Sequence, residues 1–600
     1  MISPFSNSSS TSITNRLFNV DYRDENKASF FSQEVTGMSR FGNTTYARWN
    51  DTTYPNFSSP LFPSFSGYKN VGYFHNNHFG LDGDYLCSKL NNTAPCTTWV
   101  YGFISKKNKT VQPMKVHFTL SDEELKPKPD YDCHGGGIID IDGDGHLDLY
   151  INNGAGRGII RGIIRASVLF WGSETKNDDV WSISGGANVA RDSSLENHDG
   201  DGRGRSAYFA DFNFDGLIDV LIVNIERLDS IIAPSQVFYN KGNRTFVPDN
   251  VFSEYIQAVI YANSGRKKHR NADSIIIQRS VCEQTSFCTH HVTNSWAIYM
   301  YDEKTNQMRK TYDTITKIPG IGAVQNIQMA DLNNDGIMDL FLSTQVKIHL
   351  FYSTKTTSAI FAMVKKRKPS EDILPPDGNK MSMAILDDFN LDGNMDIAAI
   401  FFNEVQKRFM TVFYSRPMFK KISPFLKQVK KKDFPSVDIT KLNKLGEDYV
   451  KSHDIASVDY NSDGFKDIVL TTKGHIYFLT NMPESSKHGQ NNFLAVVLVG
   501  NGKVNKYGIG SSLKLVVRGK ENRNQVYSFY KSVNSFSHGT TSKGGASDHR
   551  IFFGLGKLYQ PVELSITWPN GKKYFVRKWR IIKNMNNAAN PLKISYPKIA

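Results

Sequence analysis

The chain has 600 residues, of which 40% are apolar and 12% aromatic, so it is too long for one ordinary domain and can bury sizeable cores. It has no run of about 18 apolar residues, so we predict no transmembrane helix. The formal net charge of +14 would suit a nucleic-acid partner, but no recognisable nucleic-acid-binding module accompanies the basic runs at 365–368 and 430–432. We therefore expect no nucleic-acid binding and interpret both runs as exposed loop charge.

Residues 1–65 are rich in Ser, Thr, Asn and aromatic side chains, and their lack of regular patterning predicts an irregular segment. Glycosylation sequons of the form N-x-S/T crowd the amino-terminal part, which favours a secreted glycoprotein; a low-complexity Asn/Ser composition is the alternative explanation. Residues 1–30 lack the apolar core of a signal peptide, so we expect an amino terminus that is unusual or incomplete. The sequons lie at Asn7, Asn43, Asn50, Asn56, Asn91, Asn108 and Asn243.

Strand-like pieces follow between residues 66 and 130, at 98–104 and 114–119. They contain aromatic and β-branched residues but no acidic loop of the kind that recurs further along the chain. We expect them to form one degenerate unit of that repeat.

A nine-residue acidic loop recurs five times between residues 131 and 482. Asp or Asn occupies positions 1, 3, 5 and 9, and Gly occupies position 6, so oxygen ligands on alternate residues can surround one hard cation at a tight turn. The pattern predicts up to five calcium sites. Their side-chain ligands would be Asp140, Asp142, Asp144, Asp148, Asp211, Asn213, Asp215, Asp219, Asp331, Asn333, Asp335, Asp339, Asp388, Asn390, Asp392, Asp396, Asp459, Asn461, Asp463 and Asp467.

The flanking sequence distinguishes these loops from EF-hands. An EF-hand has a bidentate Glu at position 12 and a helix on either side of its loop. Each loop here leads instead into an apolar, β-branched segment such as 219–224, which is typical of a buried strand. We therefore predict a unit of strand, calcium-type loop and strand. Position 12 is Ile151, Ile222, Leu342, Ala399 and Leu470 in the five copies.

The spacing of the loops predicts a β-propeller. Their first aspartates are 71, 120, 57 and 71 residues apart, and steps of about 55–70 residues suit one four-stranded blade with a long loop. The step of 120 suits two blades. One of these, around 258–277, has Arg and Lys in place of the acids, so we predict that it folds without a metal. Together with the degenerate amino-terminal unit this makes seven blades over 66–482, and aromatic residues around an Asn/Gly turn at 236–246 predict an outer hairpin.

Five cysteines are few for a disulfide framework. Cys87 with Cys96, and Cys282 with Cys288, are spaced to close small loops. A zinc cluster that adds the two histidines at 290–291 to the second pair is the alternative. Its spacing fits zinc knuckles poorly, so we favour a hairpin disulfide.

The polar stretch 483–492 predicts a linker, and the sequence changes character after it. Residues 493–598 predict a separate small domain resembling a β-sandwich, because strand-like runs alternate with Gly-containing turns. In the clearest strand, from Val562 to Trp568, apolar and polar residues alternate, so we expect one packed face and one solvated face. The fold class that we predict for the whole chain is all-β, a seven-bladed β-propeller followed by this domain.

The acidic loops between strands resemble FG-GAP/VCBS repeats, the units of integrin-α-type propellers. This resemblance implies that the position-7 carbonyl group is a further calcium ligand, at His146, Leu217, Ile337, Asn394 and Phe465. The end of the chain resembles an ASPIC/UnbV domain in Tyr507-Gly-Ile-Gly510, His538-Gly539, Phe553-Gly-Leu-Gly556 and residues 562–571. A propeller followed directly by this domain is similar to the cartilage acidic protein family of secreted matrix proteins.

We therefore expect an extracellular, monomeric calcium-binding protein that acts as an adhesion, matrix or protein-binding module, with a protein or glycan of the matrix or cell surface as partner. Calcium is expected to staple the blades, because the carboxylates of an empty loop repel one another. The first loop, with Asp142 where the others have Asn, is expected to bind calcium most tightly. The alternative is a hydrolase or lyase with its site at the central channel, but the sequence has no nucleophile motif, phosphate-cradling Gly loop or HExxH, so we predict no catalytic residues.

Overall fold

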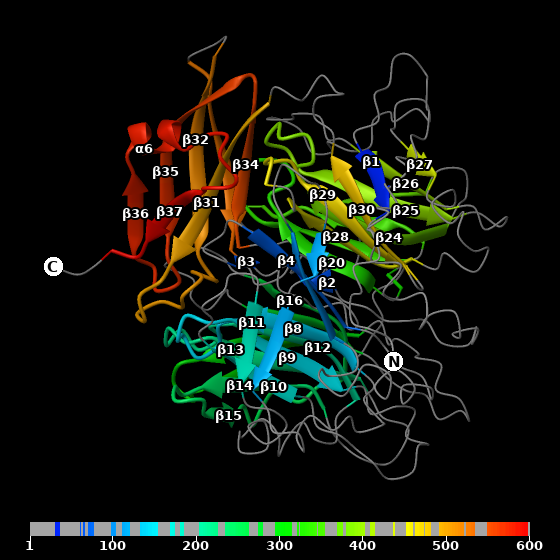
Figure 1. Ribbon diagram of the computed structural model, residues 1–600, viewed down its shortest axis with the longest axis vertical. Coiled ribbons are helices and arrows are strands. Elements are labelled where there is room, and N and C mark those ends of the chain that lie inside the picture. Colours follow the sequence, from blue (N-terminus) through cyan, green and yellow to red (C-terminus); the bar gives the residue numbers. More distant parts are fainter. Residues whose placement is uncertain are drawn as a thin grey trace, which may run out of the picture.

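In the computed structural model, the regular secondary structure of the described residues is almost entirely β-strand (Figure 1). Within the part of the chain that it describes, the one helix is α6 (Lys578–Lys583), and no helix is long and apolar enough to cross a membrane. The structure describes residues 31–35, 60–61, 64–65, 70–76, 98–103, 111–113, 115–119, 133–153, 168–173, 180–184, 203–225, 234–262, 274–279, 295–314, 321–322, 324–344, 346–354, 369–375, 380–402, 408–413, 436–438, 452–459, 462–472, 475–481, 491–520, 524–533 and 549–597.

The described residues between 31 and 481 form seven sheets of four or five strands, and nearly all of their strand pairs are antiparallel. Their number equals that of the predicted blades, and their succession is consistent with a propeller. The first sheet comprises β2 (Pro60–Leu61), β3 (Ser64–Phe65), β4 (Asn70–Asn76), β5 (Thr98–Phe103) and β6 (Val111–Pro113), and the second comprises β7 (Lys115–Thr119), β8 (Cys133–Ile139), β9 (Asp148–Asn153), β10 (Val168–Ser173) and β11 (Val180–Ser184). The third comprises β12 (Arg203–Ala210), β13 (Asp219–Ile225), β14 (Gln236–Asn240) and β15 (Phe246–Pro248), the fourth β16 (Ile256–Ala262), β17 (Ser274–Arg279), β18 (Trp296–Asp302) and β19 (Gln307–Thr314), and the fifth β20 (Val324–Ala330), β21 (Asp339–Thr344), β22 (Ile348–Phe351) and β23 (Glu371–Ile373). The sixth comprises β24 (Lys380–Asp387), β25 (Asp396–Phe402), β26 (Arg408–Phe413) and β27 (Ser436–Asp438), and the seventh β28 (Ser452–Val458), β29 (Asp467–Thr472), β30 (His475–Asn481) and β1 (Phe31–Val35).

The second strands of the repeats are buried on both faces. Strands β13 and β21 have no exposed position, which explains why their sequences are continuous apolar runs rather than alternating ones. Neighbouring sheets supply the cover, because β9 lies against β12, β13 against β16 and β21 against β24. The hydrophobic core therefore lies between successive sheets, and the loops that join first to second strands emerge at one end of it.

Four amino-terminal strands join sheets that the sequence analysis did not assign to them. Residues 1–65 were expected to be irregular, yet β2 and β3 pair with β4, and β1 pairs antiparallel with β30 as the outermost strand of the last sheet. Strand β7 was expected to belong with 98–104, but it pairs parallel with β11 of the following sheet. The pairings of β1 and β7 join strands far apart in the sequence, so local pattern could not predict them.

The predicted hairpins are confirmed. Strands β14 and β15 pair across the Asn/Gly turn and form the outer part of their sheet. Strands β16 and β17 of the unit without acids also pair antiparallel, whereas its turn at 263–273 lies outside the described residues. The four cysteines of the predicted disulfides, the basic runs at 365–368 and 430–432, and every sequon except Asn243 also lie outside them.

Residues from 492 onwards form the C-terminal domain, which has two sheets and α6 (Figure 1). One sheet has the order β34-β31-β37 and the other β33-β32-β35-β36. Leu564, Ile566 and Trp568 are buried in its core as predicted, but Val562 is only half-buried. The pairing of β35 with β32 shifts register beside Val562, which resets the alternation of faces there. The strands are β31 (Asn492–Val499), β32 (Ser512–Gly519), β33 (Val526–Ser532), β34 (Ile551–Gly556), β35 (Tyr559–Thr567), β36 (Lys573–Val576) and β37 (Leu592–Ser595).

Candidate metal centre

The five acidic loops lie between the first and second strands of five sheets and share one backbone arrangement. We number them loop 1 (140–148), loop 2 (211–219), loop 3 (331–339), loop 4 (388–396) and loop 5 (459–467). In each loop the position-1 carboxylate accepts a hydrogen bond from the Gly N–H of position 6, with N···O distances of 2.8–3.0 Å. The position-5 carboxylate accepts one from the N–H of position 7, at 2.8–2.9 Å. The loops are therefore closed turns that hold their acids in a fixed order.

Two positions of every loop have left-handed backbone. Gly at position 6 has φ between 89° and 108°, as the pattern predicted. Position 4 also has positive φ in all five loops, which the sequence analysis missed because only loop 1 has Gly there, at Gly143. The other four loops place Phe214, Asn334, Leu391 and Ser462 at φ of 57–62°. Left-handed backbone costs roughly 1 kcal/mol for such residues, so the loop network has to offset that strain.

The position-9 aspartates connect each loop to its sheet. Each of these side chains is fully buried at the start of the second strand, at Asp148, Asp219, Asp339, Asp396 and Asp467. In four loops one carboxylate oxygen accepts a hydrogen bond from the N–H of position 2, at 2.7–3.1 Å. In four loops the other oxygen accepts one from a residue at the end of the third strand, namely Gly172, Asn240, Ser353 or Asn481. The position-9 carboxylate therefore connects the start of the second strand, the loop and the end of the third strand by hydrogen bonds.

The donor set fits a hard cation. In loop 1, carboxylate oxygens of Asp140, Asp142 and Asp148 lie within 4.8 Å of one another. The Oδ1 atoms of Asp140 and Asp211 are buried and accept no hydrogen bond from any described residue, although a buried carboxylate oxygen without a partner is costly. A calcium ion at these oxygens would supply the missing partner. Oxygen ligands on a closed loop therefore suit calcium. One predicted ligand, Asn461 of loop 5, lies outside the described residues.

Burial raises the pKa of acids at positions 1 and 9 of the loops. Burial raises the pKa of Asp331 to about 7 and the pKa of Asp339 to about 8, and the neighbouring Asp335 carboxylate adds to both shifts. Burial and the Asp215 carboxylate likewise raise the pKa of Asp211. Backbone N–H groups oppose these shifts but do not cancel them. A bound cation would favour the ionised carboxylates.

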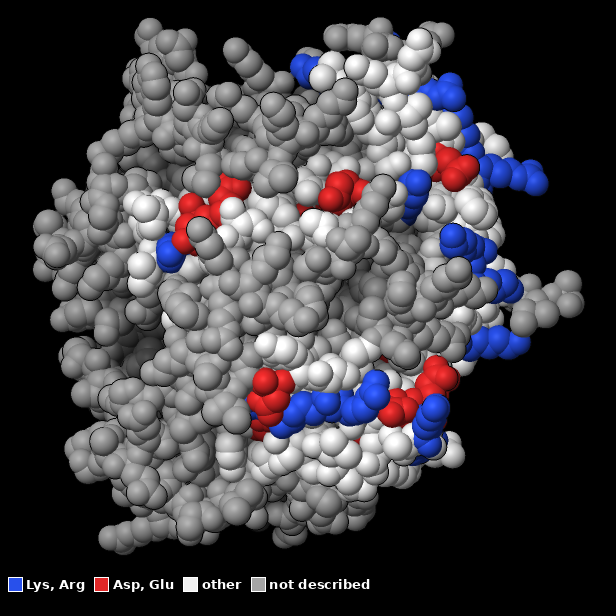
Figure 2. Space-filling model, turned by 180° about the vertical axis from the view of Figure 1, so that it is seen from behind, with Lys and Arg blue, Asp and Glu red and all other residues white. Residues whose placement is uncertain are grey.

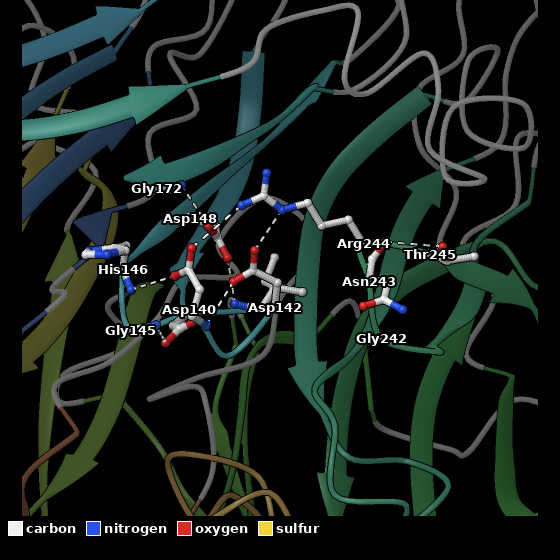
Figure 3. A network of polar contacts seen from close by, with 12 residues as sticks. Asp140, Asp142, Gly145, His146, Asp148, Gly172, Gly242, Asn243, Arg244 and Thr245 are labelled. Carbon is white, nitrogen blue, oxygen red and sulfur yellow. Dashed lines mark hydrogen bonds and ion pairs between the residues drawn. The ribbon is translucent and has the colours of Figure 1, made fainter. Parts of the chain in front are cut away.

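Loop 1 receives a cation from the neighbouring sheet (Figure 3). Arg244 extends from the turn between β14 and β15, and its Nε lies 2.8 Å from Oδ2 of Asp142. The same guanidinium group lies 3.6 Å from Asp144 and 4.6 Å from the centre of the Trp171 ring. Arg244 therefore partly neutralises the loop that has the most aspartates. This opposes the expectation that loop 1 binds calcium most tightly.

A second cation reaches loop 1 from the C-terminal domain. The Lys506 ammonium group forms an ion pair with Oδ2 of Asp140, and the hydroxyl group of Tyr507 accepts a hydrogen bond of 3.0 Å from the Asp140 N–H. Burial still raises the pKa of Asp140, although Lys506 opposes the shift. Tyr507 and Ile509 belong to the same hydrophobic cluster as β12 and β13. The Tyr507-Gly-Ile-Gly510 motif therefore packs directly on the repeats.

The C-terminal domain covers three further loops. An added Cβ at Gly336, Gly393 or Gly464 would lie within 2.1–2.7 Å of the aromatic rings of Tyr530, Phe529 and Phe493 respectively. Leu391 accepts a backbone hydrogen bond of 2.8 Å from Gly556. The position-6 glycines thus have a second role, because they make room for aromatic side chains of the C-terminal domain.

Two asparagines that the sequence analysis missed connect successive sheets. Nδ2 of Asn240 donates to the Ile141 carbonyl group of loop 1 at 3.0 Å, and Nδ2 of Asn481 donates to the Phe389 carbonyl group of loop 4 at 2.8 Å. Both side chains are buried. Both asparagines end the third strand of their sheet, and this shared position was the only signal that the sequence offered. They were missed because the number of residues between each Asn and its loop differs.

All five position-7 residues donate their backbone N–H to the position-5 carboxylate of the same loop. In loop 4 the side chain of Asn394 also takes part, because its Nδ2 donates to Oδ1 of Asp392 at 2.8 Å. Whether the carbonyl groups of these residues bind calcium stays a prediction.

Comparison with known proteins identifies the C-terminal domain. Residues 501–585 match the family model described as ASPIC and UnbV. A comparison with curated proteins gives no match. Similar solved structures include Saccharomyces cerevisiae Sqt1, with 7% identity over 72% of this chain and 97% of that chain and a TM-score of 0.34. The Aleuria aurantia lectin covers 56% of this chain and 87% of its own at 12% identity and a TM-score of 0.25. These TM-scores are too low to bear on fold or function.

Proposed function

We propose that the chain is an extracellular calcium-binding β-propeller protein of the FG-GAP/VCBS type, with calcium as a structural staple of its blades. The repeated loop network is the observation that carries this proposal. Five loops present carboxylates in the same order on the same backbone, and two buried position-1 oxygens have no hydrogen-bond partner among the described residues. Calcium would satisfy these oxygens and remove the repulsion between acids, so it would stabilise the folded state.

Calcium-dependent stability tests this function. The melting temperature of the full chain should rise when calcium replaces EDTA. Asp215→Ala should reduce this rise, because it removes an acid from loop 2. Loop 2 is chosen because no Lys or Arg of the described residues forms an ion pair with its acids. Glu563→Ala is the matched control, because Glu563 is an exposed acid of β35 outside the loops. A rise that is equal in both variants, or no calcium retained after dialysis by mass spectrometry, would reject the proposal.

An exposed surface of the C-terminal domain supports a role in adhesion or matrix binding. Phe575, Trp579 and Ile582 have 57%, 60% and 45% of their surface exposed, on β36 and α6. Residues 572–583 contain no acid, and Figure 2 shows Lys and Arg side chains along the side of the molecule where this domain lies. The basic residues of the segment are Lys572, Lys573, Arg577, Lys578, Arg580 and Lys583. Aromatic and cationic groups in one segment suit an anionic glycan.

Heparin affinity tests this partner class. The chain should be retained on heparin and elute at moderate salt, and Trp579→Ser together with Lys578→Gln should lower the salt at elution. Leu374→Ser is the matched control, because Leu374 is also an exposed apolar residue, at 67%, but lies outside the C-terminal domain. Unchanged elution of the double variant would exclude this surface as the glycan site. The alternative of a hydrolase or lyase at the channel stays a prediction from the sequence.

A further inference from the structure

A cavity of about 190 Å³ lies where the C-terminal domain meets loops 3, 4 and 5. The position-8 side chains of these loops, Met338, Met395 and Lys466, line it on one side. Residues 530–533 of β33 and its continuation, and residues 549–552 up to the start of β34, line it on the other. The cavity is therefore built by two domains and borders loops 3, 4 and 5.

Lys466 is the one charged residue at position 8 of the five loops. Leu147, Ile218, Met338 and Met395 occupy this position in the other loops, so an apolar side chain is the rule. Only 7% of Lys466 is exposed, and its ammonium group lies 4.2 Å from the centre of the Phe552 ring. Among the described residues no carboxylate lies within ion-pair distance of it. A ring contact contributes up to about 2 kcal/mol, less than the several kcal/mol that burial of an unpaired ammonium group costs.

A second ammonium group enters the same cavity from the C-terminal domain. Nζ of Lys531 lies 3.2 Å from the thioether sulfur of Met395, which is a weak acceptor. The positive charge of Lys531 favours the ionised form of Asp388 in loop 4. A calcium ion in that loop would neutralise the Asp388 carboxylate instead. Within the described part of the chain, Lys531 forms no ion pair at contact distance.

The acids that line the cavity already have partners. Asp387 accepts hydrogen bonds from the hydroxyl group of Ser457 and from the N–H of Asp388. Asp331 accepts them from the N–H groups of Gly336 and Asp335 within loop 3. Arg550, the third cation of the lining, is paired with Asp459. The two lysines are thus the lining cations that no acid of the described residues pairs with at contact distance.

We propose that this cavity binds a small organic anion, whose carboxylate or phosphate group pairs with Lys466 and Lys531. The anion supplies the negative charge that the two ammonium groups lack, and Phe552 and Met395 contact its apolar part. Because one lysine comes from loop 5 and the other from β33, the ligand joins the C-terminal domain to the repeats. This site goes beyond the proposed calcium and matrix-binding function and does not depend on the surface of residues 572–583.

Thermal unfolding of the calcium-loaded full chain tests the site with two probes. Glycerol phosphate and succinate are added separately, and sodium chloride at equal ionic strength is the reference. We expect at least one probe to raise the melting temperature beyond the chloride reference. A rise with glycerol phosphate alone assigns a phosphate ligand, and a rise with succinate alone assigns a carboxylate ligand. Equal curves for both probes and chloride would overturn the proposal.

Lys466→Met is the decisive variant, because Met occupies position 8 in loops 3 and 4. Removing an unpaired buried charge should raise the melting temperature without a probe, while the affinity for the active probe falls about tenfold or more. Lys531→Met should show the same loss of affinity, and Lys573→Met on β36 should show none. A Lys466→Met protein that melts at a lower temperature and responds to the probe like the original chain would mean that Lys466 only packs on Phe552, and would overturn the proposal.

Discussion

Nη1 of Arg550 lies 3.4 Å from Oδ2 of Asp459, and neither side chain is exposed to solvent. Arg550 also donates to the Ser462 hydroxyl group at 3.1 Å and to the Asp459 carbonyl group, so three of its contacts are in loop 5. A fourth goes to the Ala588 carbonyl group within the C-terminal domain, at 3.2 Å. One buried guanidinium group therefore fixes the C-terminal domain to the first position of a calcium-type loop.

Arg550→Met should destabilise the metal-free protein by about 3–5 kcal/mol, because it leaves the Asp459 carboxylate buried without its cation. Calcium should reduce this loss, since a cation in loop 5 would neutralise the same carboxylate. Urea unfolding in EDTA and in calcium measures both values. Lys578→Met, at an exposed position of α6, is the control, and a loss no larger than that of the control would show that the pair contributes nothing.

Lys506→Met should strengthen calcium binding at loop 1 by roughly threefold to tenfold, because it removes a positive charge from Asp140. Terbium can replace calcium, and its luminescence at loop 1 should be excited through Trp171, which precedes the Gly172 that contacts Asp148. Trp171→Phe should abolish that part of the signal. If terbium affinity is the same with and without Lys506, the ammonium group and the metal do not compete.

The stability of the metal-free protein should fall as the pH rises from about 4 to about 8. The pKa of Asp331 is raised to about 7 and that of Asp339 to about 8, from an ordinary value of 3.8. Within this range the unfolded chain releases protons that the folded chain keeps, so the free energy of unfolding decreases with pH. Below about pH 4 both states are protonated and the penalty is absent. Melting temperatures in EDTA across this range measure the slope.

Calcium should remove this slope, because the cation binds the ionised carboxylates and releases their protons. Asp331→Asn should make the EDTA curve flatter, since the variant lacks one of the titrating groups. A melting temperature that rises with pH in EDTA would contradict the buried, protonated state of these acids.

Gly464→Ala should destabilise the protein more than Gly145→Ala. Both glycines occupy position 6 with positive φ, and alanine there costs about 1–2 kcal/mol of backbone strain. A Cβ at Gly145 meets nothing within 4 Å, whereas one at Gly464 would lie 2.1 Å from the Phe493 ring. Displacing that ring should add about 1–3 kcal/mol. Equal losses in urea unfolding would mean that the C-terminal domain does not pack on loop 5 in solution.

The acidic loops were predictable because their chemistry is local. Alternate acids and a Gly within nine residues dictate both the turn and the donor set, and an apolar run after position 9 indicates the buried strand. The same local pattern predicted the hairpin of β14 and β15 and the C-terminal strands. The alternating pattern wrongly predicted that Val562 is buried, because a register shift in the pairing of β35 with β32 changes which side chains face the core there.

The sequence by itself determined the repeat, the all-β class, the C-terminal domain and the identity of the candidate ligands, because each depends on residues close together in the chain. Only the tertiary structure decided which cations reach the loops. Lys506 and Arg550 lie 366 and 91 residues from their partners Asp140 and Asp459, and no pattern encodes such pairs. The pairing of β1 with β30 and the burial of Lys466 in a cavity between two domains have the same cause. They arise when distant segments pack, and packing depends on the shape of the whole chain.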